Sequence, residues 1–275
     1  MFSLHYLDNR WVTTEDLKIS ALDLSVTRGF GIFDFLRTYK EAPFMLDEHI
    51  NRFFNSAEIL GIKPIKTKRE IEKIILDGIK KNHFENTNIK IIQTGGASDD
   101  GVTPNGKHSF IVMFTPATVY PKEYYTKGVK LITFPMGRIY TAAKSLNYMA
   151  GVIALTKAKK EKAVEALYIG QGKIYECVTA NFFAVINNQL TTAKKDILIG
   201  VTRNVVIELA KKLGIKVAER DLYLKELPQF QEAFITASNK EIMPVVEINN
   251  KVINDRKVGK ITKRIMKEFD RLTRV

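Results

Sequence analysis

Hydrophobic and polar positions follow two different periods along the first part of the chain. Residues 6–12 carry strand-forming side chains on both sides of Asp8-Asn9, which predicts a β-hairpin. Residues 47–60 have apolar side chains at helical spacing, and Gly61 follows them. Thr67 and Glu70 have the spacing of a capping box, so a second helix is predicted to begin there. This helix carries its apolar stripe on Ile71, Ile74, Ile75 and Ile79.

Shorter apolar runs dominate the rest of the chain. Residues 89–93 and 109–114 are predicted strands on either side of a glycine-rich loop at 94–101. Beyond them, strands are predicted at 129–134, 166–170, 182–186 and 233–237, and helices at 147–163, 202–214 and 259–273. The apolar stripe of the last helix is Ile261, Ile265, Phe269 and Leu272. Because the strands meander and do not alternate strictly with helices, the pattern favours an α+β fold.

A proline-bracketed connector divides the predicted elements into two groups. Thr115-Pro-Ala-Thr-Val-Tyr-Pro121 is the only segment of this kind in the middle of the chain. We therefore expect a smaller N-terminal domain at 1–115, a linker at 116–122 and a larger C-terminal domain at 123–275.

Composition narrows the class of protein. The 275 residues are 45% hydrophobic and 27% charged, as in ordinary globular proteins, and no apolar run is long enough to cross a bilayer. The single cysteine and the absence of a signal-like N-terminus favour a cytoplasmic protein. The net charge of +13 raises a nucleic-acid-binding module as an alternative, but the basic residues are mixed with acids along helix faces. Zinc-finger spacing is also absent, and neither a nucleic acid nor a metal is expected as a ligand.

Lys144 stands in an apolar and small-polar run between a predicted strand and a predicted helix. Loops at the ends of elements often present reactive side chains, and a lysine with few charged neighbours can lose its proton and act as an amine nucleophile. Glu176 precedes Asn181 and the apolar strand that follows it, so a strand–turn–strand is expected to carry this acid inward. An amine nucleophile and an inward carboxylate together suit pyridoxal 5′-phosphate (PLP) chemistry. A surface lysine and an exposed strand acid are the ordinary alternatives.

A candidate anion site begins at Gly200. Thr202 is expected to start a helix whose free N–H groups favour a phosphate, although a simply capped helix has the same pattern. Arg52, Ser238 and Asn239 are further candidates for the same anion.

Six motifs in order resemble the fold type IV PLP-dependent enzymes, which include D-amino acid transaminases, branched-chain transaminases and aminodeoxychorismate lyases. The motifs are Arg28-Gly-Phe-Gly-Ile-Phe-Asp-Phe-Leu-Arg-Thr-Tyr, His49-Ile-Asn-Arg52-Phe-Phe-Asn-Ser-Ala, Lys144-Ser-Leu-Asn-Tyr148, Glu176-Cys-Val-Thr-Ala-Asn181, Gly200-Val-Thr202-Arg and Glu241-Ile-Met-Pro-Val. The resemblance implies two α+β domains, PLP as cofactor and a homodimer.

The resemblance also implies residue roles. Lys144 would bind the cofactor covalently and carry the substrate proton, and Glu176 would hold the pyridine nitrogen. Tyr148 would donate to the phenolic oxygen. The phosphate would be bound by Arg52, Val201, Thr202, Ser238 and Asn239.

The substrate site departs from the family pattern. The loop Gln93-Thr-Gly-Gly-Ala-Ser-Asp-Asp-Gly contains no arginine or histidine to bind a substrate carboxylate. Arg28 resembles the arginine of a less usual group of D-amino acid transaminases, so it is the candidate, with Phe33 lining the pocket. An arginine that caps a strand or contacts a partner is the alternative. Cys177, after the cofactor glutamate, leaves the lyase possible.

The expected function is therefore a ping-pong transaminase acting on amino acids and 2-keto acids, with D-amino acids favoured. A branched-chain L-amino acid transaminase and an aminodeoxychorismate lyase are the alternatives among enzymes.

Overall fold

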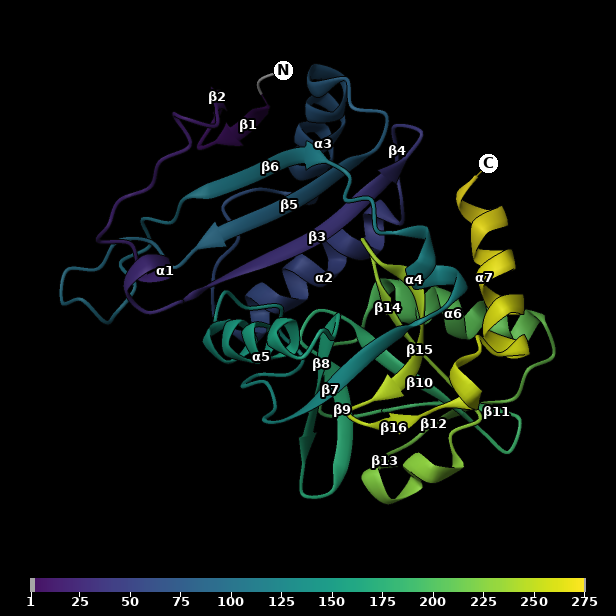
Figure 1. Cartoon of the computed structure of the whole chain (residues 1–275). Helices are drawn as coiled ribbons and strands as arrows, with labels where there is room; N and C mark the ends of the chain where they lie inside the picture. Colours follow the sequence, from purple (N-terminus) through teal and green to yellow (C-terminus); the bar gives the residue numbers. More distant parts are fainter. Residues whose placement is uncertain (1–2, 275) are drawn as a thin grey trace. The chain divides into compact units, whose positions relative to one another are not determined.

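The computed structural model describes residues 3–274, which form two units (Figure 1). The first unit comprises the chain as far as Thr118 together with Ala142–Tyr148. The second comprises Val119–Thr141 and the chain from Met149 onward. The chain passes from the first unit to the second after Thr118, inside the expected linker. The return of residues 142–148 to the first unit differs from the expected ranges, which placed them in the C-terminal domain.

The first unit is built on a six-stranded antiparallel sheet. Its strand order is β2-β1-β6-β5-β3-β4. The strands are β1 (Leu4–Leu7), β2 (Arg10–Thr13), β3 (Gly31–Tyr39), β4 (Ala42–Pro43), β5 (Thr87–Thr94) and β6 (Phe110–Pro116). The predicted hairpin is confirmed, since Asp8 and Asn9 both have positive φ, as a tight turn between twisted strands requires.

Three helices belong to the described part of the first unit, which begins at residue 3. They are α1 (Leu24–Thr27), α2 (Leu46–Ile59) and α3 (Lys68–Asn82). The capping box of α3 is confirmed: Thr67 accepts the Glu70 N–H, and the Glu70 carboxylate accepts the Thr67 N–H. Helices α2 and α3 pack on the sheet through their predicted apolar stripes, so the core lies between them and alternate strand residues such as Ile32, Leu36 and Ile91.

The second unit contains a mixed ten-stranded sheet. The main path runs β12-β11-β10-β14-β15-β7-β8-β9-β13, and β16 pairs with β15. Its strands are β7 (Val129–Pro135), β8 (Glu165–Gly170), β9 (Lys173–Cys177), β10 (Asn181–Ile186), β11 (Gln189–Thr192), β12 (Val217–Glu219), β13 (Leu222–Tyr223), β14 (Glu232–Ala237), β15 (Glu241–Ile248) and β16 (Lys251–Val252). The parallel pairs are β11 with β12, β15 with β7, and β7 with β8.

Helices of the second unit pack against this sheet. They are α4 (Lys122–Thr126), α5 (Met149–Lys160), α6 (Val201–Lys212) and α7 (Lys260–Thr273), with 3-10 helices at Leu224–Gln229 and Asn254–Arg256. The predicted stripe of α7 is wrong at one position. Leu272 is 42% exposed, because the buried face of the helix runs through Thr262, Ile265, Phe269 and Thr273. Helix α5 is shorter at both ends than the predicted 147–163.

Residues 142–148 join the first unit through backbone pairing. The Leu146 N–H donates to the Gly31 carbonyl at 2.9 Å, and Ile32 forms a β-bridge with Ser145. Glycine is needed at position 31 because its φ is positive and an added Cβ would stand 2.9 Å from the Gln93 carbonyl oxygen, as well as 2.6 Å from the Leu146 side chain. The segment carrying Lys144 is thereby fixed against the start of β3.

The mixture of helices with largely antiparallel sheets confirms the predicted α+β class. Among residues 3–274, every helix is too short or too polar to span a membrane.

Candidate active site

Lys144 is half-buried in the loop between β7 and α5. Its backbone N–H donates to the Ser56 hydroxyl at 3.0 Å, and its carbonyl accepts the Phe33 N–H at 2.9 Å. The amine nitrogen lies 4.5 Å from the centre of the Phe33 ring, and the Tyr148 ring meets the same phenylalanine edge-on at 5.6 Å. The fold thus brings together three of the predicted site residues: Phe33, Lys144 and Tyr148.

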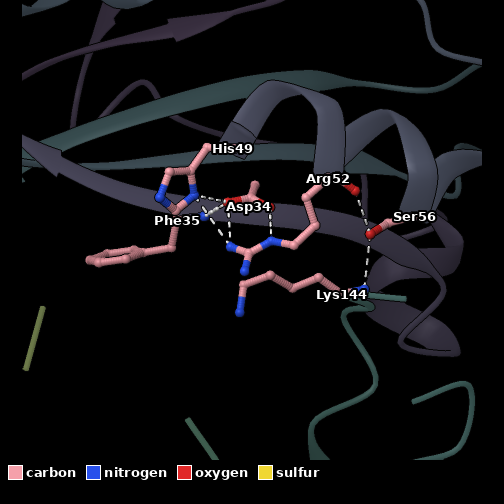
Figure 2. A network of polar contacts seen from close by, with 6 residues as sticks. All are labelled: Asp34, Phe35, His49, Arg52, Ser56 and Lys144. Atoms are coloured by element: carbon pink, nitrogen blue, oxygen red, sulfur yellow. Dashed lines mark hydrogen bonds and ion pairs between the residues drawn. The ribbon is translucent and has the colours of Figure 1, made fainter. Parts of the chain in front are cut away.

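Arg52 is held by a buried carboxylate (Figure 2). Its Nε donates to Asp34 Oδ2 and its Nη2 to Asp34 Oδ1, both at 2.8 Å, which is a bidentate pair. Asp34 is fully buried, and 12% of the Arg52 side chain is exposed. Ser56 donates its hydroxyl to the Arg52 carbonyl at 2.8 Å and accepts the Lys144 N–H, so one serine links the helix to the lysine loop.

His49 also contacts Asp34. Its Nδ1 lies 2.7 Å from Asp34 Oδ1 and 3.3 Å from Arg52 Nη2. Because the carboxylate only accepts, Nδ1 carries the proton and donates to Asp34, and the contact with Arg52 is a close approach of two donors. Burial raises the pKa of Asp34, but Arg52 and His49 more than offset it and hold that pKa below its usual range. Burial lowers the pKa of His49.

The sequence explains this cluster locally. Ile32 and Leu36 face α2 from β3, so Asp34, with the same parity, points to the same helix. His49 and Arg52 are three residues apart on α2, which places them on one helix face. Two short-range patterns therefore converge on one carboxylate.

Glu176 lies in the second unit, on β9, and is 4% exposed. Its Oε1 accepts the Leu198 N–H at 3.0 Å, and its Oε2 accepts from the Asn181 amide at 3.3 Å. Arg138 Nη1 lies 3.8 Å from Oε1. The end of β9 therefore carries the acid inward, as predicted from the strand that follows.

The start of α6 lies beside this carboxylate. Gly200 is the N-cap and has no side chain to occupy the first helical turn. An added Cβ there would stand 2.1 Å from Asn181 Oδ1, the residue that donates to Glu176. Val201 and Thr202 are buried in the first turn, and the helix begins at Val201, one residue before the predicted Thr202.

Ser238, Asn239 and Arg28 are the remaining candidates. Ser238 and Asn239 lie in the turn between β14 and β15, where the Asn239 amide donates to the Tyr120 hydroxyl at 3.2 Å. Arg28 is exposed at the end of α1, and its guanidinium donates to the Thr27 carbonyl at 2.9 Å. It forms no ion pair with any residue in the described range 3–274.

Sequence reasoning gave no role to several residues of these networks: Asp34, His49, Ser56, Arg138 and Leu198. The pattern His-x-x-Arg on a helix was the available signal for His49. Asp34 could have been found as an acid at a core-facing position of a strand. The Leu198 contact is made by a backbone N–H, and because almost every residue has one, the residue type at 198 could not indicate it.

Comparison with known proteins identifies the class. Residues 31–248 match the family model for class IV amino-transferases, so the chain belongs to this aminotransferase family. Class IV aminotransferases use PLP, which is the cofactor predicted from the sequence.

Individual relatives carry two kinds of name. A protein provisionally named branched-chain-amino-acid aminotransferase from Methanocaldococcus jannaschii is 36% identical, over 96% of this chain and 94% of that one. A D-alanine aminotransferase from Staphylococcus epidermidis is 29% identical, over 97% and 96%. The branched-chain amino acid aminotransferase structure from Escherichia coli is similar with a TM-score of 0.93 at 26% identity, covering 99% of this chain and 95% of that one. The branched-chain aminotransferase structure from Thermoproteus uzoniensis gives 0.91 at 27%, covering 99% and 94%.

Proposed function

We propose that this aminotransferase moves an amino group between an amino acid, with D-amino acids favoured, and a 2-keto acid by a ping-pong mechanism. One half-reaction releases a keto acid, and the second aminates another. The observation that carries the proposal is that half-buried Lys144 places its amine over the Phe33 ring, on a loop that Ser56 links to the helix carrying Arg52.

Lys144 suits covalent attachment to the PLP aldehyde. Its loop is anchored at the backbone by Ser56 and Phe33, while its amine lies over the Phe33 ring. His49 lies close enough to interact with Lys144, because the charge of Lys144 is, besides burial, one of the causes that lower the pKa of His49. In the reaction Lys144 would move the proton between the substrate α-carbon and C4′ of the cofactor.

Glu176 suits the pyridine nitrogen of PLP. It is a buried carboxylate with one contact to a backbone N–H and another to an amide, so its orientation is set before a ligand binds. An ionised acid at this place would keep the ring nitrogen protonated, and the ring would then serve as the electron sink that PLP supplies.

The phosphate candidates fit an anion. The first turn of α6 starts from a glycine, so the N–H groups of Val201 and Thr202 have no competing cap side chain from residue 200. Arg52 is fixed by Asp34 and would add a positive charge. We propose that Ser238 and Asn239 also bind the phosphate of PLP, and that Tyr148 donates a hydrogen bond to its phenolic oxygen.

Arg28 supports D-amino acid donors. It is an exposed arginine without a carboxylate partner in the described chain, and the Thr94-Gly-Gly loop has no cation of its own. A guanidinium would bind the substrate carboxylate in bidentate fashion, with Phe33 lining the pocket. Arg28→Ile should raise KM for the amino donor strongly while PLP stays bound. An unchanged KM would exclude this role.

Branched-chain L-amino acids are the second candidate substrates. The 36% identical relative from Methanocaldococcus jannaschii carries that name, and the similar structures from Escherichia coli and Thermoproteus uzoniensis are branched-chain enzymes. The decisive experiment is a half-reaction screen of D- and L-amino acids, followed by loss of the visible absorbance of the bound cofactor. Bleaching by D-alanine alone supports the first proposal, and bleaching by L-leucine alone supports the second. Formation of aminobenzoate from aminodeoxychorismate would instead indicate the lyase.

We further propose a cytoplasmic homodimer. Helix α5 exposes Met149 (76%), Val152 (61%) and Ile153 (56%), which have the spacing of one helix face. An apolar face of this kind commonly meets a second copy. Sedimentation should give twice the 31.3 kDa chain mass, and Val152→Asp should shift the protein toward monomer.

A further inference from the structure

The turn between β14 and β15 contains a buried lysine to which the proposed function gives no role. Lys240 directly follows Ser238 and Asn239, yet only 6% of it is exposed. Its ammonium lies 3.1 Å from Glu165 Oε1 and donates to the Thr179 hydroxyl at 2.7 Å. The Lys240 side chain therefore points into the interior of the second unit, although it is next in sequence to the proposed phosphate ligands Ser238 and Asn239.

Glu165 is the acid of this pair, and it is 1% exposed at the start of β8. The Thr179 hydroxyl donates to the same oxygen that pairs with Lys240. The Tyr120 ring also lies near the ammonium, with its centre 5.9 Å away. Burial lowers the pKa of Lys240, but the Glu165 carboxylate together with Tyr120 and Cys177 more than offsets it, so that the net pKa is raised.

Thr179 connects this pair to the predicted ring-nitrogen site. It lies in the turn between β9 and β10, which Cys177 closes by donating its N–H to the Ala180 carbonyl at 2.7 Å. Glu176 precedes this turn and Asn181 follows it. Lys240 therefore joins the turn that directly follows Glu176 to the turn that contains Ser238 and Asn239.

We propose that Lys240, paired with Glu165, is a positioning residue that holds these two turns at the separation that PLP requires. This inference rests on the proposed function. The pyridine nitrogen and the phosphate of PLP are parts of one rigid molecule, so the groups that bind them must be spaced to within about 0.5 Å. A charged, hydrogen-bonded pair in a buried setting resists displacement better than a single neutral hydrogen bond.

The test is the double variant Glu165→Leu/Lys240→Met. Apolar side chains of similar volume replace the buried pair without leaving a lone charge, so the protein should fold with wild-type thermal stability. The dissociation constant for PLP should rise at least about ten-fold, the equivalent of one lost charge-assisted hydrogen bond. The pH at which the visible absorbance of bound PLP changes should also shift, because Glu176 is held less firmly.

Two single variants serve as controls for the double variant. Lys240→Arg keeps the charge and should retain most of the PLP affinity. Lys173→Met removes the partly exposed pair with Asp221 (2.6 Å) on the same strand as Glu176, and it should leave both readouts unchanged. A double variant with the wild-type dissociation constant and pH profile overturns the inference alone. Wild-type protein that takes up no PLP overturns the proposed function, and the inference with it.

Discussion

Asp34→Asn is the substitution that tests the Arg52 network most sharply. The Asp34 carboxylate accepts two bonds from Arg52 at 2.8 Å, one from His49 at 2.7 Å and one from the Phe35 N–H at 2.7 Å. Asparagine keeps the shape but has one acceptor oxygen, and its amide group would face donors of Arg52. The change therefore removes both the charge and at least one arm of the bidentate pair.

The expected cost follows from burial. Breaking a buried ion pair by removing one partner costs about 3–5 kcal/mol. Because 12% of the Arg52 side chain is exposed and can be rehydrated in part, the lower end of this range is expected. A loss of about 3 kcal/mol corresponds to a fall in Tm of roughly 6–12 °C for a chain of this size. PLP affinity should fall as well, because Arg52 is no longer fixed.

Thermal unfolding of the cofactor-free protein by circular dichroism measures this effect. Asp77→Asn is the matched control, since Asp77 pairs with Lys73 at 3.0 Å on exposed α3 side chains of the same unit. The control should cost at most about 0.5 kcal/mol, as expected for an exposed helix pair. If the Asp34→Asn protein has the same Tm as the Asp77→Asn control, Asp34 is not the residue that holds Arg52 in place.

Three further substitutions test the start of α6, the cap of α3 and the burial of His49. Gly200→Ala places a Cβ 2.1 Å from Asn181 Oδ1, so a PLP titration should show weaker binding together with a lower Tm. Thr67→Ala removes the α3 cap and should lower the free energy of unfolding by about 1 kcal/mol in urea titrations. Burial lowers the pKa of His49 in the folded protein. Below about pH 6.5, His49 therefore becomes protonated in the unfolded chain while it stays neutral in the folded chain. Stability should fall as pH drops through this range, and His49→Gln should show a shallower fall; an identical slope would contradict the assigned shift.

Local patterns in the sequence predicted local structure well. The hairpin at Asp8-Asn9 and the capping box at Thr67 depend on neighbouring residues alone, and both are confirmed. The stripe of α7 was correct at Ile265 and Phe269 but wrong at Leu272, because Thr273 and not Leu272 continues the buried face at the end of the helix.

Long-range placement was not available from the same patterns. Composition cannot reveal that residues 142–148 pair with the start of β3, because that pairing depends on close backbone approach at Gly31. The resemblance supplied roles for Lys144 and Arg52, but the carboxylate that fixes Arg52 is seen only when β3 and α2 are packed together. The same holds for Lys240, whose pairing with Glu165 spans 75 positions of the sequence.

Borohydride trapping tests the central claim, that Lys144 is the residue that binds PLP. The wild-type protein is loaded with PLP, reduced, digested and mapped by mass spectrometry. We predict a phosphopyridoxyl group on the peptide that contains Lys144, and its loss in Lys144→Ala protein. The same group found on another lysine of the wild-type chain would contradict the account.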